Sequence, residues 1–129
     1  MTAAPAWLQL LAVTTGASAG AWLRWGAGLW LNGRWAGFPL GTLLVNCAGG
    51  LLIGALLPWL ERMPNELWRL LLVTGLLGGL TTFSSFSAES LILLHRGQWG
   101  LALSHTLAHV LGALICAFVG FLVADSLIG

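Results

Sequence analysis

Four long apolar segments run along the chain, separated by short stretches that contain polar residues, glycine or proline. Each segment is a continuous apolar run rather than an alternation of apolar and polar residues, which favours helices over strands. A helix needs about 20 apolar residues to cross the hydrocarbon core of a bilayer. The pattern therefore predicts an all-α membrane protein with four transmembrane helices, at about residues 7–31, 40–60, 67–94 and 99–123.

The ends of these segments carry the residues expected at a membrane interface. Six tryptophans, whose amphipathic rings favour the headgroup level, lie near the proposed boundaries: Trp7, Trp30, Trp35, Trp59, Trp68 and Trp99. A polar loop is expected at residues 58–66, where Pro58 and Pro64 mark the end of the second span. An even number of spans places both termini and this loop on one side of the membrane.

Composition narrows the function classes. Of the 129 residues, 58% are hydrophobic and only 7% are charged, and the mean hydropathy is +0.92. A soluble domain carries about 25% charged residues, so the apolar surplus is expected to face membrane lipid. The four spans use the whole of residues 1–129 as a single transmembrane domain. The net charge of +1 leaves no basic face for nucleic acid, and we expect no enzyme, because no nucleophile–base pair or three-ligand metal cluster is evident.

Arginines are balanced between the two sides of the predicted bundle. Arg62 and Arg69 lie on the side of the termini, whereas Arg34 and Arg96 lie on the opposite side. The positive-inside rule then gives no preferred orientation. A chain without such a preference can insert in both directions, and two opposite copies can form an antiparallel dimer.

Three residues inside the predicted spans are unusually polar for hydrocarbon: Arg24, Asn46 and Glu89. Such residues are functional candidates, because burying them in lipid costs a few kcal/mol. At about 1.5 Å of rise per residue, each lies about 8–10 Å from the same side of the membrane, so the three are expected at matching depth. Arg24 and Glu89 either form a structural pair or mark the mouth of an ion pathway. Asn46 either joins two helices or faces that pathway.

The centre of the third segment is rich in glycine and hydroxyl residues. Glycine costs about 1 kcal/mol in a helix interior, and Thr and Ser offer the backbone competing hydrogen bonds. The composition predicts an interruption at residues 78–82, with Thr81 or Thr82 as the N-cap of a second half-helix. Non-helical backbone at this depth must be buried in protein or line a polar cavity. The alternative is a kinked helix whose hydroxyls bond to its own carbonyls.

Phe83 and Phe86 follow this segment at helical spacing and share a face. Two such rings are either packing residues or a surface for a small anion, because an aromatic ring has an electropositive edge. The second reading gains weight from the hydroxyls and from the Asn46 amide expected nearby.

Three strings of residues resemble the motifs of the Fluc (CrcB) family of fluoride channels. Residues 78–89 read GGLTTFSSFSAE, residues 41–50 read GTLLVNCAGG, and residues 16–25 read GASAGAWLRW. They occur in the family's order and cover the first three spans, whereas the fourth span matches only in length and hydropathy. The resemblance implies passive export of fluoride across the bacterial cytoplasmic (inner) membrane by a multi-pass, antiparallel, dual-topology homodimer with two fluoride pathways.

The resemblance also assigns roles to individual positions. It implies that Phe83 and Phe86 present ring edges to fluoride and that Asn46 donates hydrogen bonds to it. Backbone carbonyls of Gly78 and Thr81 from both subunits are implied to hold a structural sodium ion at the dimer axis. The remaining matches are the hydroxyls of the pathway and the charges of its vestibule: Thr82, Ser84, Ser85, Arg24 and Glu89.

The fourth span departs from the family pattern. Where the family commonly presents Tyr or Ser hydroxyls, this chain offers His105, Thr106 and His109. Two histidines four residues apart share a helical face and can bind a metal, but without an evident third ligand we expect donors that line the pore or an interface. A histidine there would also add pH dependence near neutrality.

A different class of protein is the main alternative to a channel. Proton-coupled small multidrug transporters are also four-helix, dual-topology proteins, but they use a membrane-embedded acid in the first span. The first span here contains Arg24 and no acid. A purely structural subunit would not need the aligned polar residues.

Overall fold

In a computed structural model, which describes residues 3–35, 37–62 and 65–129, this part of the chain is almost entirely helical and contains no strand. Three long helices are α1 (Ala6–Leu31), α2 (Leu40–Arg62) and α6 (Trp99–Ile128). The third predicted segment is divided into four elements: α3 (Glu66–Trp68), a wider π-helical stretch η1 (Arg69–Leu77), α4 (Gly78–Leu80) and α5 (Phe83–His95). The prediction of an all-helical protein is confirmed.

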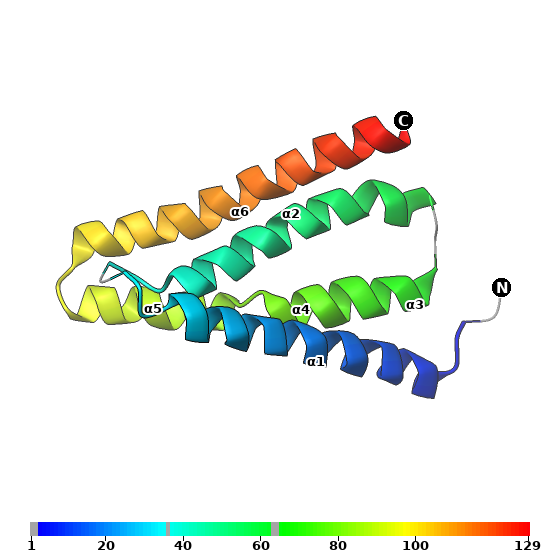
Figure 1. Cartoon of the computed structure of the whole chain (residues 1–129), viewed down its shortest axis with the longest axis horizontal. Coiled ribbons are helices and arrows are strands. Elements are labelled where there is room, and N and C mark those ends of the chain that lie inside the picture. The colour runs from blue at the N-terminus through cyan, green and yellow to red at the C-terminus, as the bar shows by residue number, and fades with distance from the viewer. Residues whose placement is uncertain (1–2, 36, 63–64) are drawn as a thin grey trace.

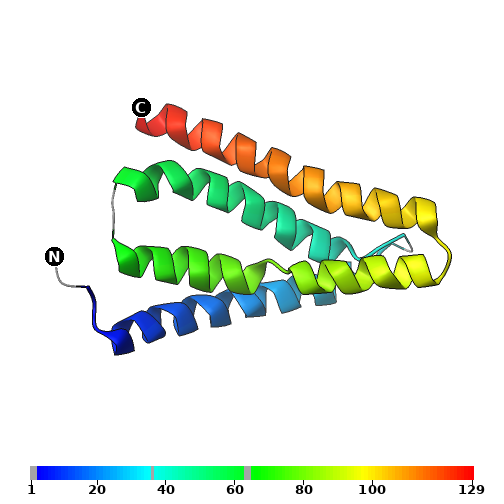
Figure 2. The same cartoon turned by 180° about the vertical axis from the view of Figure 1, so that it is seen from behind.

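The helices run up and down as a bundle of two packed pairs. Helix α2 packs along α6, and α1 packs along η1 and α4. The start of α1, the end of α2, the start of α3 and the end of α6 lie at one end of the bundle (Figures 1 and 2). The end of α1, the start of α2 and the turn from α5 to α6 lie at the opposite end, which is the arrangement expected for an even number of spans.

Three helical segments of the described chain are long and apolar enough to cross a membrane: Leu40–Arg62, Glu66–His95 and Trp99–Ile128. They correspond to the predicted second, third and fourth spans. Helix α1, with 26 residues, also has the length of a span, but several polar side chains make it less apolar than the other three.

Two boundaries differ from the prediction. Helix α2 continues to Arg62, so Pro58 is buried inside the helix instead of lying in the loop. Proline is tolerated within membrane helices because neighbouring groups can satisfy the backbone that it leaves free. Helix α6 continues five residues beyond the predicted end, to Ile128. Two residues of the predicted loop, Met63 and Pro64, lie outside the described residues.

Glycines allow both helix pairs to approach closely. An added Cβ at Gly16 or Gly20 would meet the backbone of η1 and α4, and one at Gly50 or Gly54 would meet the backbone of α6. Small residues at this spacing let helix backbones pack tightly in lipid. These glycine pairs are therefore packing positions.

The break in the third segment is confirmed, but it is shorter than predicted. Only Thr81 (φ −83°, ψ 157°) and Thr82 (φ −151°, ψ 113°) are extended. The two glycines stay helical, and Gly79 lies directly against the backbone of α1. Thr82 is the N-cap of α5, since its Oγ1 accepts the Ser85 N–H at 3.1 Å. Thr81 Oγ1 donates back to the Leu77 carbonyl at 2.8 Å, which is the bond expected of a kinked helix.

Candidate functional site

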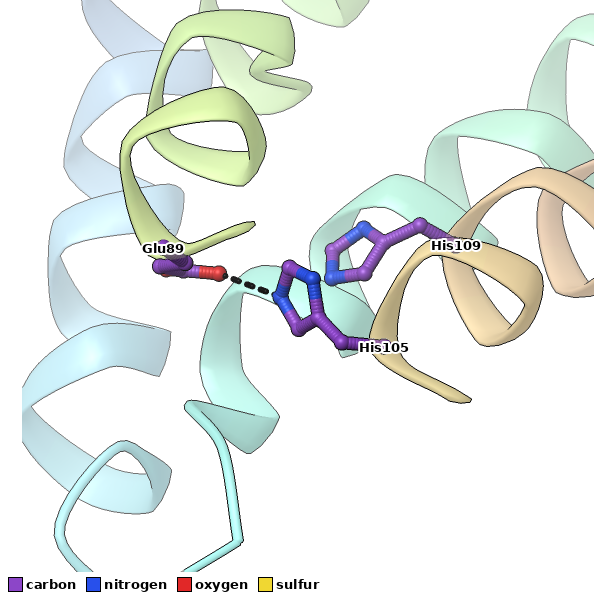
Figure 3. A group of neighbouring side chains, drawn as sticks. All are labelled: Glu89, His105 and His109. Atoms are coloured by element: carbon purple, nitrogen blue, oxygen red, sulfur yellow. Dashed lines mark hydrogen bonds and ion pairs between the residues drawn. The ribbon is translucent and has the colours of Figure 1, made fainter. Parts of the chain in front are cut away.

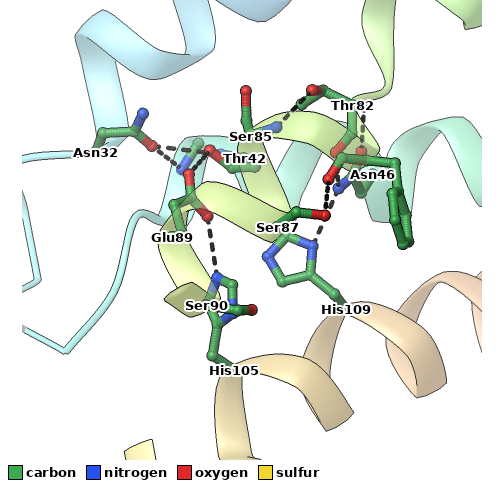
Figure 4. A network of polar contacts seen from close by, with 12 residues as sticks. Asn32, Thr42, Asn46, Thr82, Ser85, Ser87, Glu89, Ser90, His105 and His109 are labelled. Carbon is green, nitrogen blue, oxygen red and sulfur yellow. Dashed lines mark hydrogen bonds and ion pairs between the residues drawn. The ribbon is translucent and has the colours of Figure 1, made fainter. Parts of the chain in front are cut away.

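Asn46 of α2 holds the extended residue Thr82 through both backbone groups. The Thr82 N–H donates to Asn46 Oδ1 at 2.8 Å, and Asn46 Nδ2 donates to the Thr82 carbonyl at 3.1 Å. The extended backbone leaves the Thr82 N–H without a helical acceptor, so Asn46 Oδ1 takes the place of the missing carbonyl. Figure 4 shows Asn46 between the break and α6.

The same Asn46 amide contacts His109 of α6, with 3.0 Å between Nδ2 and the histidine Nδ1. The bond from the Thr82 N–H identifies the Asn46 oxygen, so Nδ2 is the donor and His109 Nδ1 must accept. Both Nδ2 hydrogens are therefore in use within this chain. An anion that takes a hydrogen bond from Asn46 has to replace the Thr82 carbonyl or His109.

The break removes the helical donors of several backbone carbonyls, including those of Gly78 and Thr81. In a continuous helix the Gly78 carbonyl would accept the Thr82 N–H, and the Thr81 carbonyl would accept the Ser85 N–H. These N–H groups bind Asn46 Oδ1 and Thr82 Oγ1 instead. Gly78 faces open space, since an added Cβ there would meet a single atom, the Val73 carbonyl oxygen, at 3.7 Å. The Gly78 and Thr81 carbonyls belong to the two residues that the family resemblance associates with sodium.

A groove of about 600 Å³ runs beside the break, between α2, η1 and α6. Apolar side chains and glycines line most of it, and its polar groups come from Asn46, Thr81, Thr82 and His109. Phe83 and Phe86 complete the lining, with their ring centroids 5.4 Å apart.

The two phenylalanine rings differ in how firmly they are held. The Phe86 ring stacks on the His105 ring, with the centroids 5.4 Å apart and the planes at 8°, and it also contacts the His109 ring at 4.9 Å. Phe83 is 79% exposed. The Phe86 ring is thus held by residues of α6, whereas the Phe83 ring is exposed at the groove.

A second, more polar cavity of about 460 Å³ lies between α1, α2 and the start of α5. Its lining includes Arg24, Thr42, Thr82 and Ser85. Thr82 lines both cavities. Thr82 therefore lies between a cavity beside a cationic side chain and a groove lined by aromatic rings.

Arg24 and Glu89 do not form the structural pair that was one of the two alternatives drawn from the sequence. Arg24 Nε donates to the Gly79 carbonyl at 3.0 Å, because α1 packs against α4 and the break leaves that carbonyl available. Glu89 turns instead toward α2 and α6. Its Oε1 accepts the Thr42 hydroxyl at 2.6 Å, and its Oε2 lies 3.0 Å from His105 Nε2.

The contacts of Glu89 extend into a polar network inside the bundle (Figure 4). The Thr42 N–H donates to Asn32 Oδ1 at 3.3 Å, and the other ring nitrogen of His105 lies 3.0 Å from the Ser90 hydroxyl. His105 is fully buried. The network connects the turn after α1 to α6 through both carboxylate oxygens.

Glu89, His105 and His109 form a cluster in which one ligand atom from each residue lies within 4.8 Å of the others. Figure 3 shows their side chains converging from α5 and α6. Sequence analysis expected no three-ligand cluster and no third ligand beside the two histidines. The positions of these three side chains contradict both expectations. Sequence analysis had marked all three residues separately, and it considered Arg24, not a histidine, as the partner that Glu89 would have if it formed a pair.

Known proteins identify the family of this chain. Residues 11–121 match the family described as "CrcB-like protein, Camphor Resistance (CrcB)". This chain belongs to the CrcB family. Proteins named fluoride-specific ion channel FluC are similar along nearly their whole length. The one from Aromatoleum aromaticum is 50% identical over 123 residues, covering 94% of both chains. The one from Marinobacter nauticus is 49% identical over 118 residues, covering 90% of this chain and 94% of the relative.

Membership of the CrcB family confirms the resemblance drawn from the three motifs. A more distant relative, the fluoride-specific ion channel FluC of Pseudomonas aeruginosa, is 43% identical over 125 residues and covers 95% of this chain. Together with the apolar helices, the family identifies a multi-pass protein of the inner membrane.

The remaining candidate residues of this CrcB protein lie at the edges of the site. Ser84 Oγ lies 3.2 Å from Thr82 Oγ1 and is exposed, whereas Ser85 lines the polar cavity. Thr106 is half-buried on α6 and lines neither cavity. Both nitrogens of His105 have partners, so of the span-four candidates His109 is the one that reaches the groove.

Proposed function

We propose that this chain is a fluoride-selective ion channel that lets fluoride leave the cell passively and so lowers the cellular fluoride concentration. The observation that carries this proposal is family membership, joined to relatives at about half identity that bear the name fluoride-specific ion channel. The family match lends no support to the alternative of a proton-coupled small multidrug transporter.

The chemistry of the site supports an anion pathway. Fluoride is small and strongly hydrated, so a selective path must replace its water with other donors. Arg24 beside the polar cavity favours negative charge there, and the Thr82 and Ser85 hydroxyls can donate to the ion. Ring edges of Phe83 and Phe86 then offer a dry, electropositive surface next to the Asn46 amide. We propose that fluoride moves from the polar cavity past Thr82 into this groove.

We further propose that α1 is the fourth span and that two copies assemble as an antiparallel, dual-topology homodimer. The freed carbonyls of Gly78 and Thr81 support this assembly, because backbone polar groups at bilayer depth must be satisfied within protein or a polar cavity. A second copy seated in the groove would remove them from lipid and would also cover Phe83. The balanced arginines permit the two orientations that such a dimer needs.

The same two carbonyls fit a structural sodium ion at the dimer interface. Carbonyl oxygens replace the hydration shell of alkali cations, and the break withdraws the helical donors of Gly78 and Thr81. The ion would supply positive charge where carbonyl dipoles of two subunits meet. This chain's own contribution is the extended backbone of Thr81 and Thr82, which Asn46 and the N-cap hold open.

The decisive experiment is ion efflux from liposomes that contain the purified protein, followed with fluoride and chloride electrodes. We expect fluoride efflux without comparable chloride efflux. Phe86→Ile should reduce the fluoride rate, whereas Phe118→Ile, on the exposed face of α6, should leave it unchanged. Absence of fluoride efflux, or chloride efflux at the same rate, would reject the proposal. A C-terminal reporter found on one side of the membrane only would reject dual topology.

A further inference from the structure

The cluster of Glu89, His105 and His109 contains a buried atom whose hydrogen-bonding capacity is unused. His109 is 4% exposed, and its Nε2 has no hydrogen-bond partner in the described part of the chain. Its Nδ1 accepts from Asn46, so the neutral ring carries its hydrogen on Nε2. Buried polar groups without partners are rare in proteins, and an ion or water commonly explains them.

The donor set has the chemistry of a transition-metal site. Two imidazoles and one carboxylate are a common zinc-binding combination, whereas sodium, magnesium and calcium favour oxygen ligands alone. Zinc lies about 2.0–2.2 Å from such ligands, which places two tetrahedral donors about 3.3 Å apart. Glu89 Oε2 and His105 Nε2 are already 3.0 Å apart. The remaining spacings are within 4.8 Å, so a small side-chain rotation at His109 completes the site.

An ion has a route to the cluster. His109 lines the open groove together with Asn46 and Phe86, and the Glu89 side chain is 14% exposed. His105 is held in place by Ser90 on its other ring nitrogen, with 3.0 Å between the two atoms. A partner on the second nitrogen orients a metal-binding histidine and makes it a better ligand.

We propose that Glu89, His105 and His109 form a binding site for Zn²⁺ and that the bound ion inhibits fluoride movement. The inhibition follows from the contact between His109 and Asn46. A metal on His109 Nδ1 displaces the Asn46 amide. A metal on Nε2 forces the ring hydrogen onto Nδ1, where it faces the Asn46 N–H. In both cases the amide that holds Thr82 loses a partner.

The binding half of this inference is independent of channel activity, and the inhibition half rests on the proposed function. The direct test is equilibrium dialysis of untagged, detergent-purified protein against Zn²⁺, with metal measured by mass spectrometry. We expect one Zn²⁺ per chain and no comparable retention of Mg²⁺. His109→Gln and Glu89→Gln should each weaken binding by roughly tenfold or more, on the scale of lost metal-site contacts.

The matched control is His95→Gln, which removes the one histidine of the chain outside the cluster, at the exposed end of α5. This variant should bind Zn²⁺ as the wild type does. Unsaturable binding to the wild type, or unchanged affinity in both His109→Gln and Glu89→Gln, would overturn the site. Size-exclusion profiles identify a variant that fails to fold, and the two ligand variants act as independent tests.

The second arm measures fluoride efflux from liposomes with Zn²⁺ added and then removed by a chelator. Wild-type protein and His95→Gln should be inhibited reversibly. Zinc binding without loss of efflux would overturn the inhibition while leaving the site intact. A wild-type protein that shows no efflux before zinc is added would instead refute the proposed channel function, and the dialysis result would still stand.

Discussion

Alanine at Asn46 would remove the only side chain that contacts both backbone groups of Thr82 among the residues that the structure describes. Three hydrogen bonds disappear: from the Thr82 N–H at 2.8 Å, to the Thr82 carbonyl at 3.1 Å and to His109 Nδ1 at 3.0 Å. Alanine offers neither a donor nor an acceptor in their place. The break then keeps its extended backbone without a partner or collapses toward a continuous helix.

The magnitude follows from what each group loses. Leaving a buried N–H without an acceptor costs about 1–3 kcal/mol, and each of the other two lost neutral bonds costs about 0.5–1.5 kcal/mol. The sum is about 2–6 kcal/mol, a large share of the roughly 5–15 kcal/mol that stabilises a typical domain. Asn65→Ala is the matched control, because Asn65 makes one exposed N-cap bond, to the Leu67 N–H at 3.0 Å. Losing such a cap costs about 1 kcal/mol.

The assay pairs unfolding in mixed micelles, titrated with a denaturing detergent at one fixed protein concentration, with fluoride efflux from liposomes. We expect Asn46→Ala to lose at least about 2 kcal/mol of unfolding free energy together with most fluoride efflux. Asn65→Ala should stay within about 1 kcal/mol of wild type and conduct normally. Equal destabilisation by the two substitutions, or wild-type efflux through Asn46→Ala, would refute the reasoning that Asn46 maintains the break.

Three further comparisons test the packing and the polar contacts. Gly20→Ala places a Cβ against the backbone of η1 and α4 and should lower the unfolding free energy by about 1–3 kcal/mol. Its control is Gly26→Ala, whose added Cβ has no neighbour within 4 Å and which should be neutral or raise the unfolding free energy by up to about 1 kcal/mol. Equal effects of the two substitutions would contradict the close packing. Arg24→Gln should slow fluoride efflux, because the polar cavity loses its cation, and Arg34→Gln, at an exposed position after α1, should not. Thr42→Val removes the hydroxyl that donates to Glu89 at 2.6 Å and should cost about 1–3 kcal/mol, so an unchanged unfolding midpoint would count against that bond.

Features that depend on position along one helix were predictable from the sequence. Apolar run lengths located the helices, and glycine followed by hydroxyl residues located the break. The preference of threonine for the N-cap position left Thr81 and Thr82 as candidates, and the structure selects Thr82. The glycines were placed inside the break by their low helix propensity, but tertiary packing overrode it: Gly79 remains helical because its missing side chain admits the backbone of α1.

Contacts between helices were not predictable, because depth in the membrane fixes only one coordinate. Arg24 and Glu89 were expected at matching depth, yet α1 packs against α4 while α5 faces α2 and α6. The direction in which each helix turns its polar face decides the partner. For the same reason the histidine spacing was visible in α6, whereas the third member of the cluster, Glu89, required knowledge of how α5 and α6 pack.

The occupied state of Asn46 bears on how a channel of this kind can conduct. Conduction requires an ion to bind well enough to enter and weakly enough to leave. A buried amide N–H without a partner would donate a full charge-assisted hydrogen bond to fluoride, and the ion would then be released slowly. Here both Nδ2 hydrogens already serve the Thr82 carbonyl and His109. In the pathway proposed above, fluoride would exchange with an existing partner of Asn46, and only the difference between the two bonds would hold the ion. The contacts that stabilise the break would then also limit how tightly that pathway binds its ion.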